Sequence, residues 1–158
     1  MKPTIHLAII FFLSLLSNLS FGQSKSDPAG LLYGDWVCVK HYYRGLQKFS
    51  AKQAEQIRKS TLSIRPNTYS FSKAKFVKQC HFYKWQMHKF DLAEEAYSYS
   101  FQYAYTKPEL AKMGAYEPVD AKGEYACFNE CSGIFMKKDT VIMSCGGYAF
   151  FWLRKKNQ

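Results

Sequence analysis

Hydrophobic and polar residues alternate along much of this chain with the period of two that a β-strand requires. The pattern is cleanest over residues 97–105, where aromatic residues alternate with small or polar ones. Because successive side chains of a strand point to opposite faces of the sheet, this segment predicts a strand with one aromatic face. Its aromatic positions are Tyr97, Tyr99, Phe101, Tyr103 and Tyr105.

Other segments show the same tendency, and short turns separate them. The predicted strands cover residues 35–43, 61–65, 68–72, 76–87, 97–105, 124–129, 134–137, 140–145 and 148–154. On the first of these strands, Trp36 and Cys38 fall on one face. Connections such as Gly146-Gly147 are too short for crossovers, so the strands are predicted to be mostly antiparallel.

A short helix is predicted after the first strand. Ser50 and Gln53 form a capping-box pattern, in which two side chains satisfy backbone donors at the start of a helix. Ala51, Ala54 and Ile57 then make a narrow apolar stripe at helical spacing. A further helical turn is predicted over residues 107–113. About eight or nine sequential antiparallel strands with so little helix favour an all-β fold, either a closed up-and-down barrel or a sandwich.

The first 22 residues predict a cleavable signal peptide. Lys2 gives a positive start, residues 5–16 are almost entirely apolar, and Gly22 is a small residue just before the expected cleavage at Gln23. A membrane helix is the competing interpretation, but the apolar run is short for one. No cysteine follows the cleavage point closely, so no lipid anchor is expected. The mature protein is predicted to be secreted or periplasmic, with a polar leader over residues 23–33, one domain over residues 34–158 and no stable membrane span.

The mature chain is strongly basic. Of 22 lysine and arginine residues only Lys2 leaves with the signal peptide, so 21 remain against 12 acidic residues and the formal charge is +9. Export argues against nucleic acid as a partner, and an acidic protein or an anionic component of the cell envelope fits the charge better. The alternative is a solubilising charge without a partner, since the basic residues are scattered.

All cysteines belong to the mature chain, at Cys38, Cys80, Cys127, Cys131 and Cys145. An oxidising compartment favours disulfides, so we expect at least one, with Cys38–Cys145 as the preferred pair. Cys80 reaches Cys127 or Cys131 only if their strands or turns are neighbours. The alternative is buried thiols that pack as small hydrophobic groups.

No catalytic or metal site is predicted. His81 and His88 lie among the cysteines, but disulfides are favoured over a metal site in this compartment. The spacing of Cys127 and Cys131 does not match that of a zinc knuckle. The chain has no Gly-x-Ser-x-Gly elbow and no phosphate-binding glycine loop. We therefore expect no enzyme, no metal and no other cofactor.

Gly34, Asp35 and Trp36 open the first predicted strand, and Arg154 ends the last one. This pair of features resembles lipocalins and related calycin barrels. The layout also resembles small secreted bacterial lipocalin-like proteins, with a short helix after the first strand and a Gly-Gly turn before the last. The resemblance implies a barrel in which Gly34, Trp36 and Arg154 tie the first and last strands together. A guanidinium over an indole contributes roughly 0.5–2 kcal/mol. The other interpretation is a core tryptophan and a solvated arginine.

Two functions of different class fit these features. The first is a binding protein for a small hydrophobic ligand, with Trp36 and the aromatic face of residues 97–105 lining a cavity in the barrel. That face has two other interpretations, as packed core or as an exposed contact surface. The second function is an extracytoplasmic interaction protein, such as an inhibitor or immunity-type protein, whose basic barrel surface meets an acidic partner.

Overall fold

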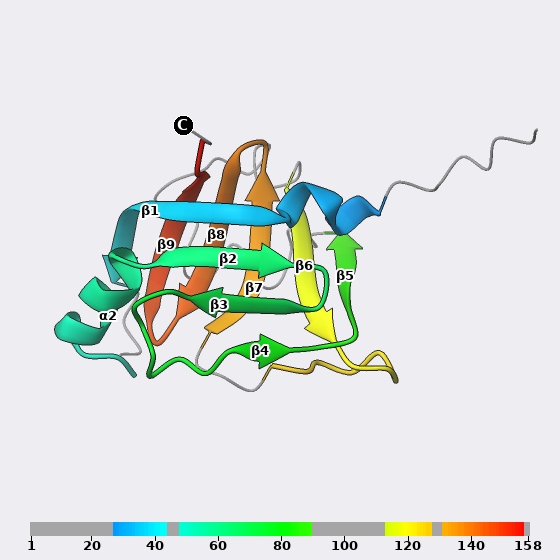
Figure 1. The fold of residues 1–158 in the computed structure, drawn as a ribbon, viewed down its shortest axis with the longest axis horizontal. Coiled ribbons are helices and arrows are strands. Elements are labelled where there is room, and N and C mark those ends of the chain that lie inside the picture. The colour runs from blue at the N-terminus through cyan, green and yellow to red at the C-terminus, as the bar shows by residue number, and fades with distance from the viewer. Residues whose placement is uncertain (1–26, 44–47, 90–112, 128–130, 157–158) are drawn as a thin grey trace, which may run out of the picture.

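The computed structural model describes residues 27–43, 48–89, 113–127 and 131–156 (Figure 1). The predicted signal peptide and the aromatic strand over residues 97–105 lie outside the described residues. The predicted helical turn also lies outside them, except for its last residue, Met113. These three features therefore stay predictions.

Strands make up most of the described chain, which contains one short α-helix. The elements are η1 (a 3₁₀ helix, Pro28–Leu32), β1 (Gly34–Tyr43), α2 (Ala51–Arg58), β2 (Thr61–Arg65), β3 (Thr68–Phe71), β4 (Cys80–His81), β5 (Lys84–Lys89), β6 (Gly114–Val119), β7 (Cys131–Lys137), β8 (Thr140–Cys145) and β9 (Tyr148–Arg154). All strand pairs are antiparallel. The predictions of an all-β antiparallel fold and of a short helix after the first strand are confirmed.

All of these strands belong to one curled sheet of 9 strands, in the order β4-β3-β2-β1-β9-β8-β7-β6-β5. Strands that follow one another in sequence are neighbours in the sheet, except β4 and β5, which form its two edges. Figure 1 shows β1, β2 and β3 crossing in front of β7, β8 and β9, so the sheet folds over itself. Within the described residues no hydrogen-bonded ladder joins β4 to β5.

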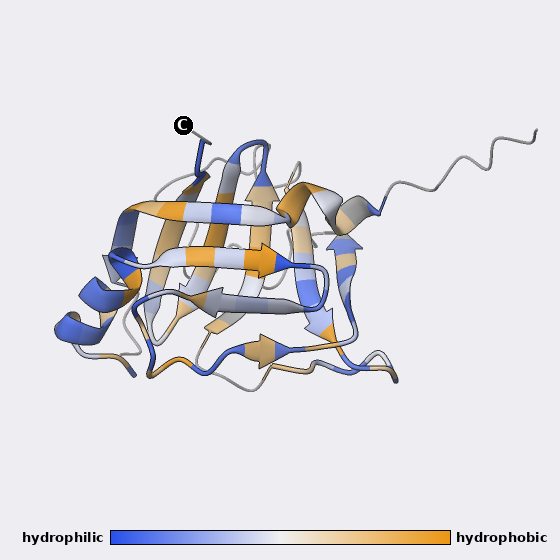
Figure 2. Cartoon of the chain, in the orientation of Figure 1, coloured by the Kyte–Doolittle hydropathy of each residue, from blue (hydrophilic) through white to orange (hydrophobic). Residues whose placement is uncertain are grey.

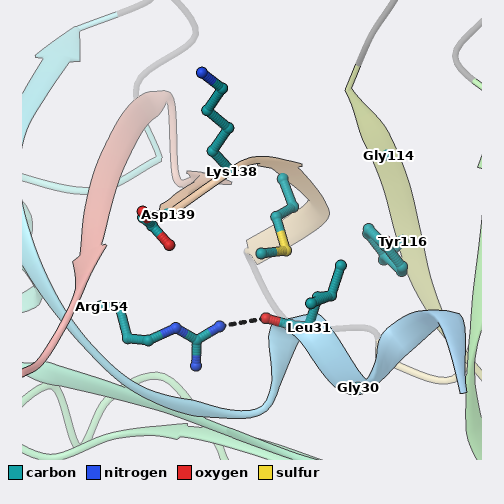
Figure 3. Close-up of a pocket in the computed structure, with 8 residues that line it drawn as sticks. Gly30, Leu31, Gly114, Tyr116, Lys138, Asp139 and Arg154 are labelled. Atoms are coloured by element: carbon teal, nitrogen blue, oxygen red, sulfur yellow. Dashed lines mark hydrogen bonds between the residues drawn. The ribbon is translucent and has the colours of Figure 1, made fainter. Parts of the chain in front are cut away.

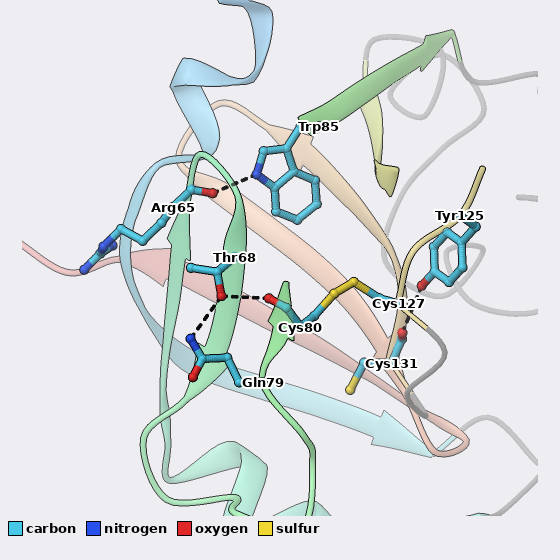
Figure 4. Close-up of a disulfide and its surroundings, with 8 residues drawn as sticks. All are labelled: Arg65, Thr68, Gln79, Cys80, Trp85, Tyr125, Cys127 and Cys131. Carbon is cyan, nitrogen blue, oxygen red and sulfur yellow. Dashed lines mark hydrogen bonds between the residues drawn. A yellow bond between two sulfur atoms is a disulfide. The ribbon is translucent and has the colours of Figure 1, made fainter. Parts of the chain in front are cut away.

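The two edges nevertheless approach each other where the chain passes from β4 to β5, a place we call the seam. The backbone N–H of Phe82 donates to the Asn67 carbonyl (3.0 Å), and that of Tyr83 donates to the Val119 carbonyl (2.9 Å). The indole N–H of Trp85 in β5 also donates to a backbone carbonyl at the end of β2 (2.9 Å, Figure 4). These bonds connect both halves of the sheet at the seam.

β1 pairs with both β2 and β9 and so joins the two halves of the sheet. A bulge between Cys38 and Lys40 shifts its register with β9. Because a bulge inserts one residue into the alternation, Trp36 before it and His41 beyond it both face the concave side. The His41 ring stacks there on the ring of Phe150, with centroids 5.4 Å apart.

An aromatic core fills the concave side of the sheet and extends to the seam. Neighbouring ring centroids lie 4.5–6.3 Å apart along the series Phe150, Trp152, Phe71, Tyr69, Trp85 and Phe82. Separations of this size are typical of favourable aromatic pairs. Burial of one such side chain stabilises the fold by about 1.5–3 kcal/mol, so this series is a major source of stability.

α2 packs against the same core. Its N-terminus has the predicted capping box: the Gln53 N–H donates to Ser50 Oγ (3.3 Å), and the Ser50 N–H donates to Gln53 Oε1 (2.9 Å). Ala54 and Ile57 are buried in the core, whereas Figure 2 shows hydrophilic residues over the rest of the helix. The docking of this apolar stripe explains how so short a helix is stable.

Phe49, just before α2, covers the turn between β8 and β9. The backbone N–H groups of Lys48 and Phe49 both donate to the Gly146 carbonyl (3.0 Å). Gly146 has a φ of +52°, and a Cβ at this position would lie 2.2 Å from the Phe49 ring. The glycine is therefore required both by the turn and by the ring that packs on it.

Three stretches differ from the sequence prediction. Residues 76–87 do not form one strand, because the chain turns at residues 75–76 and again at the seam. Residues 124–127 form no strand and contribute a single bridge between Val119 and Tyr125. The alternation pattern does not predict β6, which contains Pro118, a residue that cannot donate to a ladder. Only residues 114–116 of β6 pair with β7, so the pairing with β7 needs no backbone N–H at Pro118.

Two disulfides are present, which confirms the prediction of at least one. Cys80–Cys127 ties the edge strand β4 to the loop after β6 (Figure 4). Cys131–Cys145 joins directly opposed residues of β7 and β8. The preferred pair Cys38–Cys145 is wrong, because Cys38 is free.

The strand register explains why Cys38 and Cys145 cannot pair. Cys38 lies opposite Trp152 of β9, and Trp152 lies opposite Val141 of β8. Val141 precedes Cys145 by four residues, which is about 13 Å along a strand. A disulfide needs α-carbons within about 7 Å of each other.

Candidate functional site

η1 covers one end of the sheet, which we call the η1 end. Asp27 caps this helix: its Oδ1 accepts a hydrogen bond from the Ala29 N–H (2.9 Å), and its Oδ2 accepts one from the Tyr33 hydroxyl. Burial, together with this carboxylate, raises the pKa of Tyr33, so its hydroxyl stays protonated. Ala29 and Leu32 are buried in the core. Part of the segment expected as a polar leader is thus folded against the sheet.

Trp36 and Arg154 meet beneath η1. The Trp36 side chain is fully buried, and its indole N–H donates to the Leu32 carbonyl (2.9 Å). The guanidinium carbon of Arg154 lies 4.3 Å from the centroid of the indole. The same guanidinium donates to the carbonyls of Tyr33 (2.7 Å) and Leu31. Arg154 therefore joins η1 to both β1 and β9.

Gly34 leaves the space that the guanidinium occupies. Its φ is +149°, and a Cβ at this position would lie 2.6 Å from Arg154 Nη1. Any side chain here would push the guanidinium away from Trp36. The structure thus brings together the three residues predicted to tie the first and last strands, and it pairs β1 with β9.

A pocket of about 630 Å³ opens beside this contact, between η1, the start of β6 and the turn from β7 to β8 (Figure 3). This volume is within the range of small-molecule sites. Its wall is apolar and its rim is charged. The wall contains Leu31, Tyr116 and Met136, the rim contains Lys138, Asp139 and Arg154, and Gly30 and Gly114 complete the lining.

The fold determines the position of these side chains. Tyr116 and Met136 come from β6 and β7 and belong to the core cluster, so the pocket reaches the concave side of the sheet. A Cβ at Gly114 would lie 2.7 Å from the Tyr116 ring, so the glycine leaves room for that ring. Lys138 has a φ of +52° in the turn that carries the charged rim.

The rim of the pocket carries charges of both signs, with the cations in excess. Lys138 and Arg154 bring two positive charges to the rim, and Asp139 brings one negative charge. Burial, and to a smaller extent the charge of Asp27, raises the pKa of Tyr116, so its hydroxyl stays protonated at neutral pH. The site therefore combines apolar surface with cations and a neutral hydroxyl, a suitable combination for an amphiphilic molecule.

One polar group of the core lacks a partner. The indole N–H of Trp152 is fully buried and has no hydrogen-bond acceptor among the described residues. Trp152, Val141, Met136 and Gly114 lie in one row across β9, β8, β7 and β6. This row connects the unpaired donor to two residues that line the pocket.

The residues predicted to bind a ligand are only partly placed. Trp36 is fully buried beneath Arg154 and is not among the residues that line the pocket. The aromatic positions of residues 97–105 lie outside the described residues. Sequence analysis did not identify Tyr116 or Met136, because their role depends on the pairing of β6 with β7.

The described residues contain no group of three or more His, Cys, Asp or Glu side chains that could hold a metal ion. Cys80, Cys127 and Cys131 are in disulfides, and His88 lies 3.3 Å from a carboxylate oxygen of Glu117. Among the helices of the described chain, none has the length and apolarity needed to cross a bilayer.

A comparison with protein-family models gives no match, and comparisons with curated proteins and with solved structures give no significant match either. The function is therefore inferred from the sequence and the geometry of this chain alone.

Proposed function

We propose that the protein is an exported, lipocalin-like binding protein, and that its pocket at the η1 end holds a small molecule with an apolar body and an anionic head. The observation that carries this proposal is the pocket itself, with about 630 Å³ of space, apolar side chains on its wall, and two cations and one carboxylate on its rim. Tyr116 and Met136 offer the surface against which an apolar body would pack. Lys138 and Arg154 offer the charge that an anionic head requires.

Arg154 has the donors for such a role even though it already has partners. A guanidinium carries five N–H groups in a fixed fork. Two carbonyls, those of Tyr33 and Leu31, accept one bond each. The remaining N–H groups are available to a ligand, and the existing contacts hold the side chain in place, which lowers the entropic cost of binding.

The lipocalin-like part of the proposal requires the sheet to close into an up-and-down barrel at the seam. Three features support closure: sequential strands are neighbours in the sheet, β1 pairs with β9, and a two-residue connection links β4 to β5. The Cys80–Cys127 disulfide joins the edge strand β4 to the loop that follows β6, and β6 is the neighbour of the other edge strand, β5. Closure also protects the edges of a sheet that is rich in aromatic residues.

Binding of anilinonaphthalene sulfonate tests the proposal, because this fluorescent probe has an aromatic body and an anionic head. Gly30 lines the pocket, and no atom lies within 4 Å of a Cβ built at this position, so Gly30→Phe adds a ring to the pocket lining without a clash at its Cβ. We expect this variant to weaken probe binding about tenfold or more. Gln56→Phe adds the same ring on the exposed face of α2 and serves as the control, with unchanged binding expected.

The charge requirement is tested with Lys138→Gln and a neutral probe, phenylnaphthylamine. The variant is expected to weaken binding of the sulfonate and to leave that of the neutral probe unchanged. Near-ultraviolet circular dichroism establishes that each variant keeps native packing. The proposal is wrong if Gly30→Phe binds the sulfonate as tightly as the unmodified protein does.

A further inference from the structure

Carboxylates lie among the cations at the η1 end. Arg154, Lys138 and Asp139 all line the pocket. Burial raises the pKa of Tyr116, and the charge of a second carboxylate, that of Asp27, adds to this rise, so Asp27 lies near the pocket as well. The described residues therefore place two cations and two carboxylates around this space. Their formal charges balance, which a ligand with a purely anionic head would not match.

The two carboxylates differ in what they can offer a ligand. Both oxygens of Asp27 already accept hydrogen bonds, from the Ala29 N–H (2.9 Å) and from the Tyr33 hydroxyl. In the part of the chain that the structure describes, the Asp139 carboxylate takes part in no ion pair and accepts no hydrogen bond. Asp139 is therefore the carboxylate that can pair with a group outside the protein.

The turn from β7 to β8 keeps Asp139 apart from its neighbour Lys138. These two residues form the whole connection, because Lys137 and Thr140 on either side of it are paired. Both are exposed. Figure 3 shows the two side chains extending from the turn in different directions, so their charges are directed to different places. Each charge can thus meet a different group of the same ligand.

A purely anionic head would fit this rim poorly. Its charge would lie close to the Asp139 carboxylate as well as to the cations, and like charges placed near each other oppose binding. The head would also shield Asp139 from water, and a charge that loses water needs a partner of opposite sign. A head that carries a cationic group beside its anionic group removes both costs. Arg154 keeps N–H groups beyond those it donates to the Tyr33 and Leu31 carbonyls, and these can receive the anionic group.

Building on the proposed function, we propose that the ligand is a single-chain amphiphile with a zwitterionic head. Its anionic group lies against Arg154 and Lys138, its cationic group pairs with Asp139, and its chain packs on the apolar wall of the pocket. Figure 3 shows Asp139 and Arg154 on one side of the pocket and Tyr116 on the other, an arrangement in which head and chain occupy different parts of the space.

Three probes with the same decyl chain test the head group by isothermal titration below the concentrations at which they form micelles. Decyl phosphocholine is zwitterionic, decyl sulfate is anionic and decyltrimethylammonium is cationic. The oxidised mature protein is compared with Asp139→Asn, since asparagine also suits a tight turn. Glu124→Gln is the matched control, because it removes one exposed carboxylate that does not line the pocket. Near-ultraviolet circular dichroism checks that each variant keeps native packing.

We expect the unmodified protein to bind decyl phosphocholine about fivefold or more tightly than either other probe, the size of effect that one partly exposed ion pair gives. Asp139→Asn is expected to remove this preference, weakening decyl phosphocholine and strengthening decyl sulfate. Glu124→Gln is expected to keep the preference.

The variant Gly30→Phe separates failure of the head group from failure of the pocket, since we expect it to weaken all three probes. Absence of binding by every probe, or binding that Gly30→Phe leaves unchanged, contradicts the proposed function and the zwitterionic head together. If Gly30→Phe weakens binding, but decyl sulfate or decyltrimethylammonium binds the unmodified protein as tightly as decyl phosphocholine does, only the zwitterionic head is wrong. Equal effects of Asp139→Asn and Glu124→Gln on the preference also overturn the role of Asp139 and leave the proposed function standing.

Discussion

Trp36 and Trp152 are both fully buried in the same core, but their indole N–H groups differ in their surroundings. The N–H of Trp36 donates to the Leu32 carbonyl at 2.9 Å, and its ring lies beneath Arg154. The N–H of Trp152 has no acceptor among the described residues. The substitutions Trp36→Phe and Trp152→Phe therefore remove the same atoms. The first removes a hydrogen bond that the fold makes, whereas the second removes a buried donor that has no acceptor in the described part of the chain.

The difference between the two variants follows from these contacts. Both lose the same side-chain volume, so the cavity contributions largely cancel in the comparison. Trp36→Phe removes a hydrogen bond worth about 0.5–1.5 kcal/mol, leaves the Leu32 carbonyl without that donor, and weakens the contact with Arg154. Trp152→Phe removes a buried donor whose unmade bond costs about 1–3 kcal/mol. We expect Trp36→Phe to lower the free energy of unfolding by about 2–4 kcal/mol more than Trp152→Phe.

Urea denaturation of the oxidised protein, followed by far-ultraviolet circular dichroism, measures both free energies without relying on tryptophan fluorescence. Arg154→Lys, alone and combined with Trp36→Phe, completes a double-mutant cycle for the guanidinium contact. We expect the combined loss to be smaller than the sum of the single losses, because either change weakens the same contact. Equal destabilisation by the two tryptophan variants, or greater destabilisation by Trp152→Phe, would refute the reasoning.

Two further predictions concern covalent and ionic contacts. Replacing Cys80 and Cys127 by Ala is expected to lower the free energy of unfolding by about 4 kcal/mol. The same replacement of Cys131 and Cys145 is expected to lower it by about 3 kcal/mol. The bridges span 47 and 14 residues, and the longer loop restricts the unfolded chain more. Urea denaturation of the two double variants checks this, and a larger effect of the shorter loop contradicts it. Hydrogen bonds from a serine and an arginine of β2 hold the pKa of Asp35 below its ordinary value of 3.8. Asp35→Asn is expected to lower the free energy of unfolding by less than about 1 kcal/mol at neutral pH. This loss should vanish as the pH falls through the lowered pKa, because the native carboxyl is then also protonated. A difference between the two proteins that stays constant from neutral pH to about pH 2 contradicts this explanation.

Local patterns in the sequence predicted those parts of the fold that depend on local physics. The bounds of β2, β8 and β9 agree with the alternation of residues 61–65, 140–145 and 148–154, since tight turns end these strands. The capping residues Ser50 and Gln53 likewise placed the start of α2. In each case the sequence contains both the element and a signal that marks one of its ends.

The features that sequence analysis missed depend on partners that are distant in the chain. The bulge after Cys38 exists only in the pairing of β1 with β9. The position of that pairing also separates Cys38 from Cys145. β6 is stabilised by its neighbours although Pro118 argues against a strand. Residues 28–32 were expected in a polar leader, yet Leu32 is buried by the core beneath it.

The same distinction applies to the candidate site. Gly34, Trp36 and Arg154 were predicted together from a family resemblance, and their contact has a simple steric cause in this chain. The pocket combines residues from η1, β6, the turn from β7 to β8 and the end of β9. No single segment contains a pattern for it, so only the three-dimensional arrangement identifies it.

The location of the pocket follows from how the two ends of the sheet are covered. At the turn from β8 to β9, the ring of Phe49 lies directly on Gly146 and leaves no room for even a Cβ. At the η1 end, Arg154 makes its contacts through backbone carbonyls and the Trp36 ring, and a charged side chain keeps its remaining donors toward water or a ligand. Aromatic rings fill the core between the two ends, so open space with available donors remains beside Arg154. The proposed ligand binding at this end would therefore use a side chain that the fold already holds in place and would not require the core to open.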